Sequence, residues 1–307
     1  MLDIVIVNWN AGAYLTNCIY SVISNSNGLV NKIIIVDNAS TDHSAQSVEG
    51  LDKVQLIYAN DNLGFGKACN LGAASCSSEF ILFLNPDAGI YADTLEKTIA
   101  FMQHPDQQQV AICGVQLINE ASTVTPSCSR FPSVVGFLSH ALALDKVFPQ
   151  LGNLMADWDH ASTRKVDQII GAFLFMRRKV FVELDGFDEN FFVYFEEVDL
   201  SLRTARAGWH SVYYAGAQAF HAGGGTSNKV KARRLFYSTR SRLIYSFKNF
   251  SPLGAVCVAA ITLAIEPFSR TTLGILRWSP SSVCETWAGY VMLWQWLPQW
   301  VLKGQTR

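Results

Sequence analysis

The stretch "FILFLNPDAGI", residues 80–90, joins a run of five large apolar residues to a polar corner, Asn85-Pro86-Asp87. Asn, Pro and Asp are residues that stop strands and begin turns, which is one interpretation of this corner. The other interpretation is that a buried strand delivers a carboxylate oxygen to a metal ion at the mouth of a cleft. A ligand site, unlike a turn, needs further polar residues at the ends of neighbouring strands.

Three earlier segments repeat the same design of an apolar run that ends in polar residues. They are "LDIVIVNWN" (2–10), "NKIIIVDNAS" (31–40) and "KVQLIYANDN" (53–62). Near-continuous apolar runs are typical of parallel strands that are covered on both faces. Between the runs the sequence predicts helices at 13–24, 44–49 (short), 65–74 and 92–104. This alternation indicates a parallel α/β sheet with crossover helices.

Ligands of such sheets bind beyond the carboxyl ends of the strands. All four predicted strands end in polar side chains at that edge, and those chosen as candidate site residues are Asn8, Asn10, Asp37, Asn60 and Asn85. One polar strand end is ordinary, whereas four that converge on one edge indicate a site. The first turn lacks the G-x-G-x-x-G pattern of dinucleotide-binding folds, and "GFGKA" at 64–68 lacks the spacing of a phosphate-binding P-loop.

The bulk composition sets limits on the class of protein. The chain has 307 residues, of which 50% are apolar and 16% charged, with a mean hydropathy of +0.17. No window reads as a clean membrane span, which needs about 20 apolar residues. Seven cysteines without any C-x-x-C pair favour a reducing compartment. The N-terminus has no basic region followed by a long apolar run, so we expect no signal peptide.

Charge is divided unevenly along the chain. Residues 1–199 contain 23 acids and 11 bases, whereas residues 200–307 contain 2 acids and 13 bases, which predicts an anionic partner for the basic part. A basic and aromatic stretch at 229–248 precedes short apolar runs, interrupted at Glu266-Pro267, and a Trp-rich end. This combination suits the headgroup zone of a membrane surface. Packing on the sheet domain or on a second subunit, in a homodimer, is the alternative.

Six ordered blocks carry a family resemblance. They are "VIVNWN" (5–10), "IIVDNASTD" (34–42), "NDNLGFGKACNLG" (60–72), "FLNPDA" (83–88), the segment 171–209 and "HAGGGTS" (221–227). Together they resemble the family 2 glycosyltransferases of the GT-A fold, and most nearly the bacterial rhamnosyltransferases. The resemblance implies a Rossmann-like, mostly parallel sheet flanked by helices over residues 1–227, with a donor half at about 1–105 and an acceptor half at about 106–227. Residues 228–307 would form a basic, Trp-rich helical region that associates with a membrane.

The resemblance also implies a metal-assisted donor site. A divalent ion, Mg²⁺ or Mn²⁺, would bridge the two phosphates of a nucleotide sugar and stabilise the charge of the leaving group. Asn85-Pro86-Asp87 stands where the family has its D-x-D motif, so Asp87 would be a metal ligand, with one carboxylate fewer than the full motif. His221 resembles the histidine that completes the metal site in related transferases.

The same resemblance assigns residues to the nucleotide. Asp37 would hold the base or the ribose, because Ser40 and Asp42 are available for local capping. Asn60 and the segment from Gly64 to Lys67 would line the pocket, where glycines let the backbone approach the donor. A phosphate contact and a solvated position on a helix are both open for Lys67.

The segment "YFEEVDLSLR" belongs to the acceptor side. Inversion at the anomeric carbon is a single displacement, which needs one general base and no protein nucleophile. Glu196 and Glu197 match an acidic pair of the family, so Glu197 would be the base and Glu196 would orient the acceptor or the loop. Because Glu is longer than the family's Asp, the register also allows Glu196. Alternatively, both acids with Asp199 form the first turn of a helix, where Arg203 pairs with Asp199.

These observations predict an inverting, metal-dependent enzyme that transfers one sugar, rhamnose by resemblance, from a nucleotide-diphosphate donor to a lipid-linked glycan. It would act in cell-surface polysaccharide synthesis, attached to the cytoplasmic face of the membrane. A nucleotide-sugar-binding module without turnover is an alternative, because a fold does not guarantee a function. A processive polysaccharide synthase is a weaker one, since Gly274 stands at the Gln position of its Q-x-x-R-W motif. No nucleic-acid-binding module is recognisable.

Overall fold

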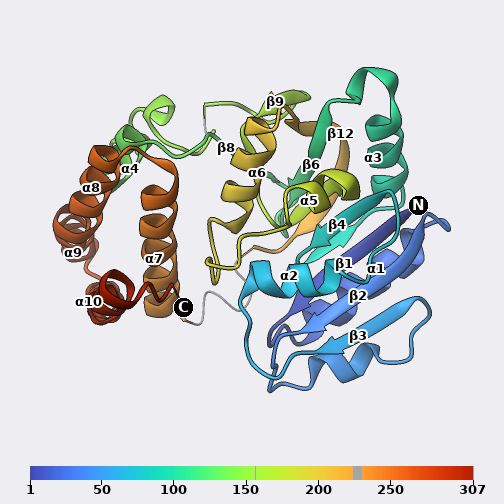
Figure 1. The fold of residues 1–307 in the computed structure, drawn as a ribbon, viewed down its shortest axis with the longest axis horizontal. Helices are drawn as coiled ribbons and strands as arrows, with labels where there is room; N and C mark the ends of the chain where they lie inside the picture. The colour runs from blue at the N-terminus through green and yellow to red at the C-terminus, as the bar shows by residue number, and fades with distance from the viewer. Residues whose placement is uncertain (156, 224–229, 307) are drawn as a thin grey trace. The chain divides into compact units, whose positions relative to one another are not determined.

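The computed structural model describes residues 1–155, 157–223 and 230–306, which divide into two compact units (Figure 1). The first, here called the sheet unit, contains Met1–Arg130, Trp158–Glu189 and Glu196–Thr226. The second, the helical unit, contains Phe131–Asp157, Asn190–Phe195 and Ser227–Arg307. The predicted boundary at 227 stays a prediction, and the helical unit takes in two earlier segments besides the C-terminal region.

The four predicted strands of the donor half form one parallel block, in the order β3-β2-β1-β4. They are β1 (Leu2–Asn8), β2 (Val30–Asp37), β3 (Val54–Tyr58) and β4 (Phe80–Leu84). The predicted helices are confirmed as α1 (Ala13–Asn25), α2 (Phe65–Ala73) and α3 (Thr94–Gln103), while 44–49 is a 3-10 turn, η1 (Ser44–Val48). The carboxyl ends of these strands therefore meet at one edge, as the sequence predicts.

The acceptor half extends the sheet with strands of mixed direction. The order continues β4-β11-β6-β12-β5, with β11 antiparallel to both of its neighbours and β12 parallel to β6. These strands are β5 (Ala88–Ile90), β6 (Val110–Ile118), β11 (Phe173–Arg177) and β12 (His210–His221). Strand β6, a nine-residue strand that is buried almost throughout, is not among the four strands that the sequence predicts.

The remaining elements of the sheet unit are short. They are η2 (Pro105–Gln107), β7 (Val124–Thr125), β8 (Cys128–Ser129), β9 (Arg164–Val166), β10 (Gln168–Ile169), α5 (Arg178–Glu183) and α6 (Glu196–Arg206). Helix α2 packs very closely on the sheet, because a Cβ atom added at Gly72 would lie 2.6 Å from Val5 Cγ1. This close packing fixes where α2 begins, at the strand edge that carries the polar residues.

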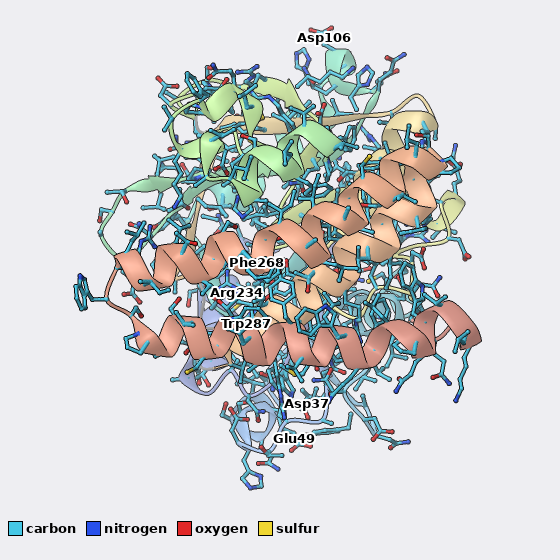
Figure 2. The ribbon with its side chains drawn as sticks, turned by 90° about the vertical axis from the view of Figure 1, so that its left-hand side faces the viewer. Asp37, Glu49, Asp106, Arg234, Phe268 and Trp287 are labelled. Atoms are coloured by element: carbon cyan, nitrogen blue, oxygen red, sulfur yellow. The ribbon has the colours of Figure 1, made fainter. Side chains whose placement is uncertain are left out.

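The helical unit is built from five main helices and two 3-10 turns. They are α4 (Val134–Ala141), η3 (Leu144–Lys146), η4 (Pro149–Leu151), α7 (Lys231–Asn249), α8 (Pro252–Ala260), α9 (Glu266–Leu276) and α10 (Pro280–Lys303). Figure 2 shows Phe268 of α9 and Trp287 of α10 on neighbouring helices, and their ring centroids are 6.0 Å apart. Close packing of α10 on α7 requires Gly289, where an added Cβ would lie 2.9 Å from the Ala232 carbonyl oxygen.

Helices α8 and α9 form one continuous helix, joined by a π-helical turn, η6 (Ile261–Ile265). The expectation that no window reads as a clean membrane span is therefore wrong by length and composition, because the helix Pro252–Leu276 has 25 residues and contains an 18-residue window with a mean hydropathy of 1.6. Pro267 does not break the helix, since it lies in the first turn of α9 after the π-helical turn. The core helix of a soluble protein can have the same length and hydropathy, so these two properties do not by themselves indicate a membrane span.

The basic stretch predicted to face a membrane is only partly available for that role. Arg240 is buried, with its guanidinium 5.4, 5.2 and 5.0 Å from the ring centroids of Phe192, Phe236 and Tyr237. Arg242 is also buried, so the prediction is wrong for both arginines. Both lie on the side of α7 that packs inside the helical unit, and Lys229 lies outside the described residues. The exposed cations of α7 are Lys231, Arg233, Arg234 and Lys248.

Arg242 pairs with a buried carboxylate, Glu266, which also binds Arg270 through two nitrogens at 2.8 and 2.7 Å. We expect Arg242→Met to lower the free energy of unfolding by about 3 kcal/mol, because the buried Glu266 charge loses one of its two partners. Denaturant unfolding of the purified chain measures this. The double variant Arg242→Met/Glu266→Gln should recover most of the loss, and an equally unstable double variant would contradict this account.

Candidate active site

The corner that follows β4 is a tight turn with a defined direction. The Ala88 backbone N–H donates to the Asn85 carbonyl oxygen at 3.0 Å, and the Asn85 N–H donates to the Ala172 carbonyl oxygen at 3.1 Å. The turn interpretation of this sequence is thus confirmed. It does not compete with a ligand role, because β5 begins directly after Asp87 and carries that residue toward β12.

Pairing between β5 and β12 brings Asp87 beside His221. Ala88 lies opposite His221 in the ladder, and the Ala222 N–H donates to the Asp87 carbonyl oxygen at 3.0 Å. Asp87 Oδ1 then lies 3.4 Å from His221 Nε2, and the two side chains are 13% and 15% exposed. Two residues separated by more than 130 positions therefore present an oxygen and an imidazole nitrogen to the same small volume.

This pair fits two adjacent ligands of one hard divalent cation. Ligands at about 2.1 Å in an octahedral shell lie roughly 3 Å apart when adjacent, close to the separation between Asp87 and His221. Within the described residues no group of three or more His, Cys, Asp and Glu side chains gathers around a common point. The remaining positions would fall to water and to substrate phosphates, which is the usual arrangement for Mg²⁺.

A thiol that the sequence did not indicate lies beneath this corner. Cys18 of α1 is buried and its Sγ donates to the Asn85 carbonyl oxygen at 3.6 Å. Burial raises the pKa of this thiol, and the negative charge of Asp87 raises it further. Cys18 therefore stays a neutral thiol that supports the turn and does not compete as a thiolate ligand. One cysteine in an amphipathic helix gives no signal of such a role.

At the other end of the donor edge, a buried amide positions a carboxylate. Asn8 is fully buried, and its Nδ2 donates to Asp37 Oδ1 at 2.7 Å and to Ser44 Oγ at 2.8 Å. The Ser40 backbone N–H donates to the second oxygen, Asp37 Oδ2, at 3.2 Å. Asn8, predicted to bind the donor, is thus placed to act through Asp37. Asp42 caps as expected, since it accepts from the N–H groups of Gly12 and Ser44.

The side-chain amides of Asn10 and Asn38 link neighbouring loops through hydrogen bonds. Asn10 Oδ1 accepts the Thr41 N–H at 2.8 Å. Asn38 is not among the predicted site residues, although its position directly after Asp37 at the strand end is a signal for such a role. It donates to the Gly64 carbonyl oxygen at 3.1 Å and accepts from the Leu63 N–H at 2.7 Å. The loop before α2 is therefore fixed to the end of β2.

The other predicted donor residues are exposed to different degrees. Asn60 is exposed, and Gly64, the residue before α2, adopts a φ of 76°, which favours glycine. Lys67 forms an ion pair with Glu189 at 3.1 Å, and both side chains are about half exposed. The Lys67 ammonium group is therefore paired with a carboxylate in this structure. A contact between Lys67 and the donor phosphate stays a prediction.

The acidic pair begins helix α6, as the sequence predicts. Glu196, Glu197 and Asp199 all lie in its first turn, and Arg203 Nε donates to Asp199 Oδ2 at 2.7 Å. The Glu197 carboxylate has one oxygen, Oε2, that is screened from solvent and has no hydrogen-bond partner in the described parts of the chain. Burial raises the pKa of Glu197 to about 6, although the backbone N–H groups of Glu197 and Val198 oppose this shift.

The backbone just before the acidic pair is strained. Tyr194 and Phe195 adopt φ values of 69° and 70°, in the left-handed region that side chains larger than glycine disfavour. Two such residues in succession cost about 1–3 kcal/mol each, and strain of this kind clusters at active sites.

The segment from Gly64 to Lys67, which is predicted to line the nucleotide pocket, contacts the acidic pair Glu196 and Glu197 through Gly66 and Glu196. A Cβ atom added at Gly66 would lie 3.3 Å from Glu196 Cβ and 3.1 Å from Phe187 Cβ, so the start of α2 can approach α6 only because residue 66 is glycine. Two groups of predicted residues are therefore neighbours in the sheet unit. A carboxylate with its pKa near 6, in a pair that contacts the segment predicted to line the nucleotide pocket, is placed to take a proton.

Comparison with known proteins agrees with this geometry. The family model "Glycosyl transferase family 2" matches residues 3–184, which is more than half of the chain. The N-acetylglucosaminyl-diphospho-decaprenol L-rhamnosyltransferase of Mycobacterium tuberculosis is 27% identical over 266 residues, covering 80% of this chain and 83% of the relative. Rhamnosyltransferase WbbL of Escherichia coli is 27% identical over 237 residues, covering 70% and 84%.

Solved structures show the same fold at low sequence identity. A mannosyltransferase of Pyrobaculum calidifontis, in complex with GDP-Man and Mn²⁺, aligns with a TM-score of 0.56 at 14% identity, covering 99% of this chain and 83% of its own. TarS of S. aureus, in complex with UDP-GlcNAc, aligns with a TM-score of 0.53 at 16% identity, covering 94% and 79%. The predicted fold and enzyme class are confirmed, and this chain belongs to glycosyl transferase family 2, with rhamnosyltransferases among its relatives.

Proposed function

We propose that the enzyme inverts the anomeric carbon while it transfers one sugar from a nucleoside diphosphate to a lipid-linked glycan, with rhamnose as the sugar. The names of the two bacterial relatives support the sugar, and the name of the mycobacterial one supports a lipid-diphosphate acceptor. The observation that carries the proposal is the convergence of Asp87 and His221 at the end of the donor sheet.

Glu197 acts as the general base in this proposal. As the acceptor hydroxyl oxygen attacks the anomeric carbon, the bond from that carbon to the phosphate oxygen breaks and the nucleoside diphosphate leaves. The hydroxyl proton passes to the Glu197 carboxylate, which needs to be ionised at the start. Glu196, buried next to Gly66, holds the start of the helix.

The donor is held at two points of the sheet edge. Asp37 and the corner at Asp87 follow strands β2 and β4, which are separated by β1, a spacing of roughly 10 Å across the sheet. A nucleoside diphosphate bridges such a gap, with its ribose or base at Asp37 and its phosphates at Asp87. A divalent cation held by Asp87 and His221 would stabilise the negative charge of the leaving diphosphate.

Attachment to the cytoplasmic face of the membrane completes the proposal. The helical unit exposes large apolar side chains, among them Leu253 (75%), Ile275 (65%), Leu276 (70%), Trp278 (92%), Val301 (72%) and Leu302 (81%). Exposed apolar side chains that include Trp, together with the exposed cations of α7, suit the interface of an anionic bilayer.

A thermal-shift panel of nucleotide sugars, each with and without Mn²⁺, tests the donor specificity. A donor that binds the folded chain stabilises it by mass action, so the largest shift should come from a dTDP-linked deoxysugar with Mn²⁺ present. Transfer from that donor to a lipid-linked diphosphate acceptor then tests the reaction. A product that retains the anomeric configuration would exclude the single displacement.

The pH dependence of transfer follows from Glu197. Its pKa is raised to about 6, so the base is ionised above that pH and becomes protonated below it. We expect kcat/KM to fall about tenfold per pH unit below 6, because the protonated carboxyl cannot accept the hydroxyl proton. A rate that stays constant down to pH 4.5 in a folded enzyme would contradict this assignment.

A further inference from the structure

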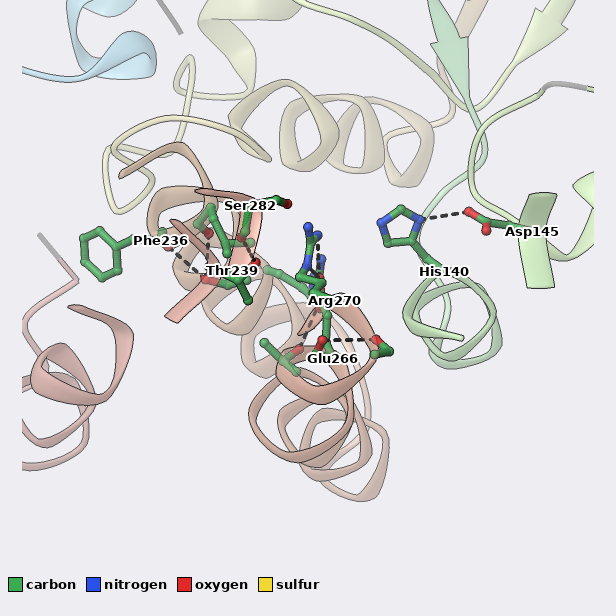
Figure 3. Close-up of polar contacts among 12 residues, drawn as sticks. His140, Asp145, Phe236, Thr239, Glu266, Arg270 and Ser282 are labelled. Carbon is green, nitrogen blue, oxygen red and sulfur yellow. Dashed lines mark hydrogen bonds and ion pairs between the residues drawn. The ribbon is translucent and has the colours of Figure 1, made fainter. Parts of the chain in front are cut away.

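A cavity of about 180 Å³ lies within the helical unit, and the active-site account does not use it. Its lining includes Glu266 and Arg270 of α9 and Arg277, the residue that follows this helix. Lys146 and Ser282 also line the cavity. Figure 3 shows Glu266, Arg270 and Ser282 in this region, with the Glu266–Arg270 contact drawn as dashed lines.

The cavity has a surplus of positive charge. Glu266 is its one carboxylate among the lining residues, and it is shared by Arg270 and Arg242. Burial raises the pKa of Glu266, but the two arginines outweigh this effect and hold that pKa at about 2, so the group is ionised at neutral pH. Arg277 and Lys146 form no ion pair within the described residues, which leaves their charges for a ligand.

Polar groups around the mouth add to this character. His140 lines the cavity and is oriented by Asp145, with 2.8 Å between its Nδ1 and the carboxylate Oδ2 (Figure 3). Ser282 lies in the first turn of α10, a 24-residue helix whose N-terminal N–H groups carry partial positive charge. Hydroxyl, imidazole, ammonium and guanidinium groups that converge on one small cavity suit a phosphate group.

Exposed apolar residues stand next to both free cations in the sequence, and these point to a lipid. Lys146 is followed by Val147, which is 70% exposed, and Leu144, two residues before it, is 40% exposed. Arg277 lies between Leu276 and Trp278, which are 70% and 92% exposed. A site for a soluble phosphate has no need of exposed apolar residues next to its cations, whereas a lipid phosphate has hydrocarbon directly attached.

We propose that this cavity binds the phosphate group of a membrane lipid, with the hydrocarbon of that lipid lying on the neighbouring apolar side chains. Two lipids share this chemistry, an anionic phospholipid and the polyprenyl diphosphate that would carry the acceptor glycan. The second of these rests on the proposed function, whereas the first does not.

Binding of the full chain to vesicles tests the proposal, in a chelator and without donor, so that the active site contributes nothing. The probes are phosphatidylcholine vesicles alone, with phosphatidylglycerol, and with a polyprenyl diphosphate. We expect Lys146→Ala/Arg277→Ala to weaken binding to the phosphate-bearing vesicles that the wild type prefers by roughly 30-fold. The matched control is Lys179→Ala/Arg206→Ala, which removes the same charges from exposed positions of α5 and α6 in the sheet unit.

A second variant separates the cavity from general attraction to the bilayer. Ser282→Trp leaves the charge unchanged but fills the mouth, so we expect it to weaken binding to the same vesicles. Adsorption without a site would instead leave this variant unchanged or stronger, and would weaken both charge variants equally. Either result, or equal binding of the wild type to all three vesicles, would overturn the proposal.

The vesicles also identify the source of the phosphate. A preference for polyprenyl diphosphate over phosphatidylglycerol assigns the cavity to the acceptor lipid, and equal binding to both assigns it to the general headgroup. An enzyme that transfers sugar but shows no cavity-dependent binding would refute this inference alone. A chain that binds lipid phosphate but never uses a donor would refute the proposed function alone.

Discussion

Glu197→Gln is expected to reduce sugar transfer about 1,000-fold, the midpoint of the range for loss of a positioned general base. Glutamine keeps nearly the same shape but cannot accept the proton of the acceptor hydroxyl. The donor should bind as before, because Glu197 serves the acceptor side of the reaction. Single-turnover transfer measures the chemical step, and calorimetry with the nucleotide sugar measures binding.

Two controls make this result specific. Glu183→Gln changes a glutamate that is about half exposed on the same unit, at the end of α5, and should leave transfer unchanged. Glu196→Gln distinguishes the two members of the pair, since a larger loss in that variant would move the role of base to Glu196. In Glu197→Gln the fall in rate below pH 6 should also disappear.

Asp87→Asn is expected to lower transfer by about three orders of magnitude, equivalent to roughly 4 kcal/mol of transition-state stabilisation. The substitution removes the one carboxylate charge from the pair that would hold the cation. The concentration of Mn²⁺ that gives half-maximal rate should rise, because amides bind hard cations less strongly than carboxylates. A metal titration of the transfer rate measures both effects.

The contact between Asp87 and His221 provides a further check. If both hold one cation, the double variant Asp87→Asn/His221→Ala should be scarcely worse than Asp87→Asn alone, because residues that act as one site are not additive. Asp106→Asn, in the exposed 3-10 turn η2 of the sheet unit, is the matched control for the change in charge. Strictly additive losses would show that the two residues act separately.

The donor half was predictable from the sequence because each of its strands is an unbroken apolar run that ends in polar residues. Its parallel pairing then follows from the helices between the runs. The missed strand β6 carries Gly114 and Gln116 within its apolar run, which weakens the signal. Gly114 is needed there, since an added Cβ would lie 2.5 Å from a side-chain carbon of Ile169, a contact that no local pattern reveals.

The charged residues of the C-terminal region were harder to place. A basic stretch ordinarily indicates a solvated surface, but Arg240 stacks on Phe192, which lies 48 residues earlier in the chain. Arg242 finds its partner Glu266 on another helix. Local sequence gives the sign of these charges but not their partners, so exposure could not be separated from burial. In the candidate site, the residue types were predictable, whereas the positioning role of Asn8 and the raised pKa of Glu197 depend on burial.

The segment Asn190–Phe195 belongs to the helical unit, although the residues on either side of it belong to the sheet unit. Ser241 of α7 donates to the Val193 carbonyl oxygen at 2.8 Å, and Phe195 packs on Tyr245 with ring centroids 5.4 Å apart. A chimaera that borrows the C-terminal helices of a relative by a single crossover would separate this segment from the α7 it evolved with. Exchanging the helical unit between such enzymes therefore calls for three grafts made together, in which the pieces around 131–157 and 190–195 accompany the C-terminal helices.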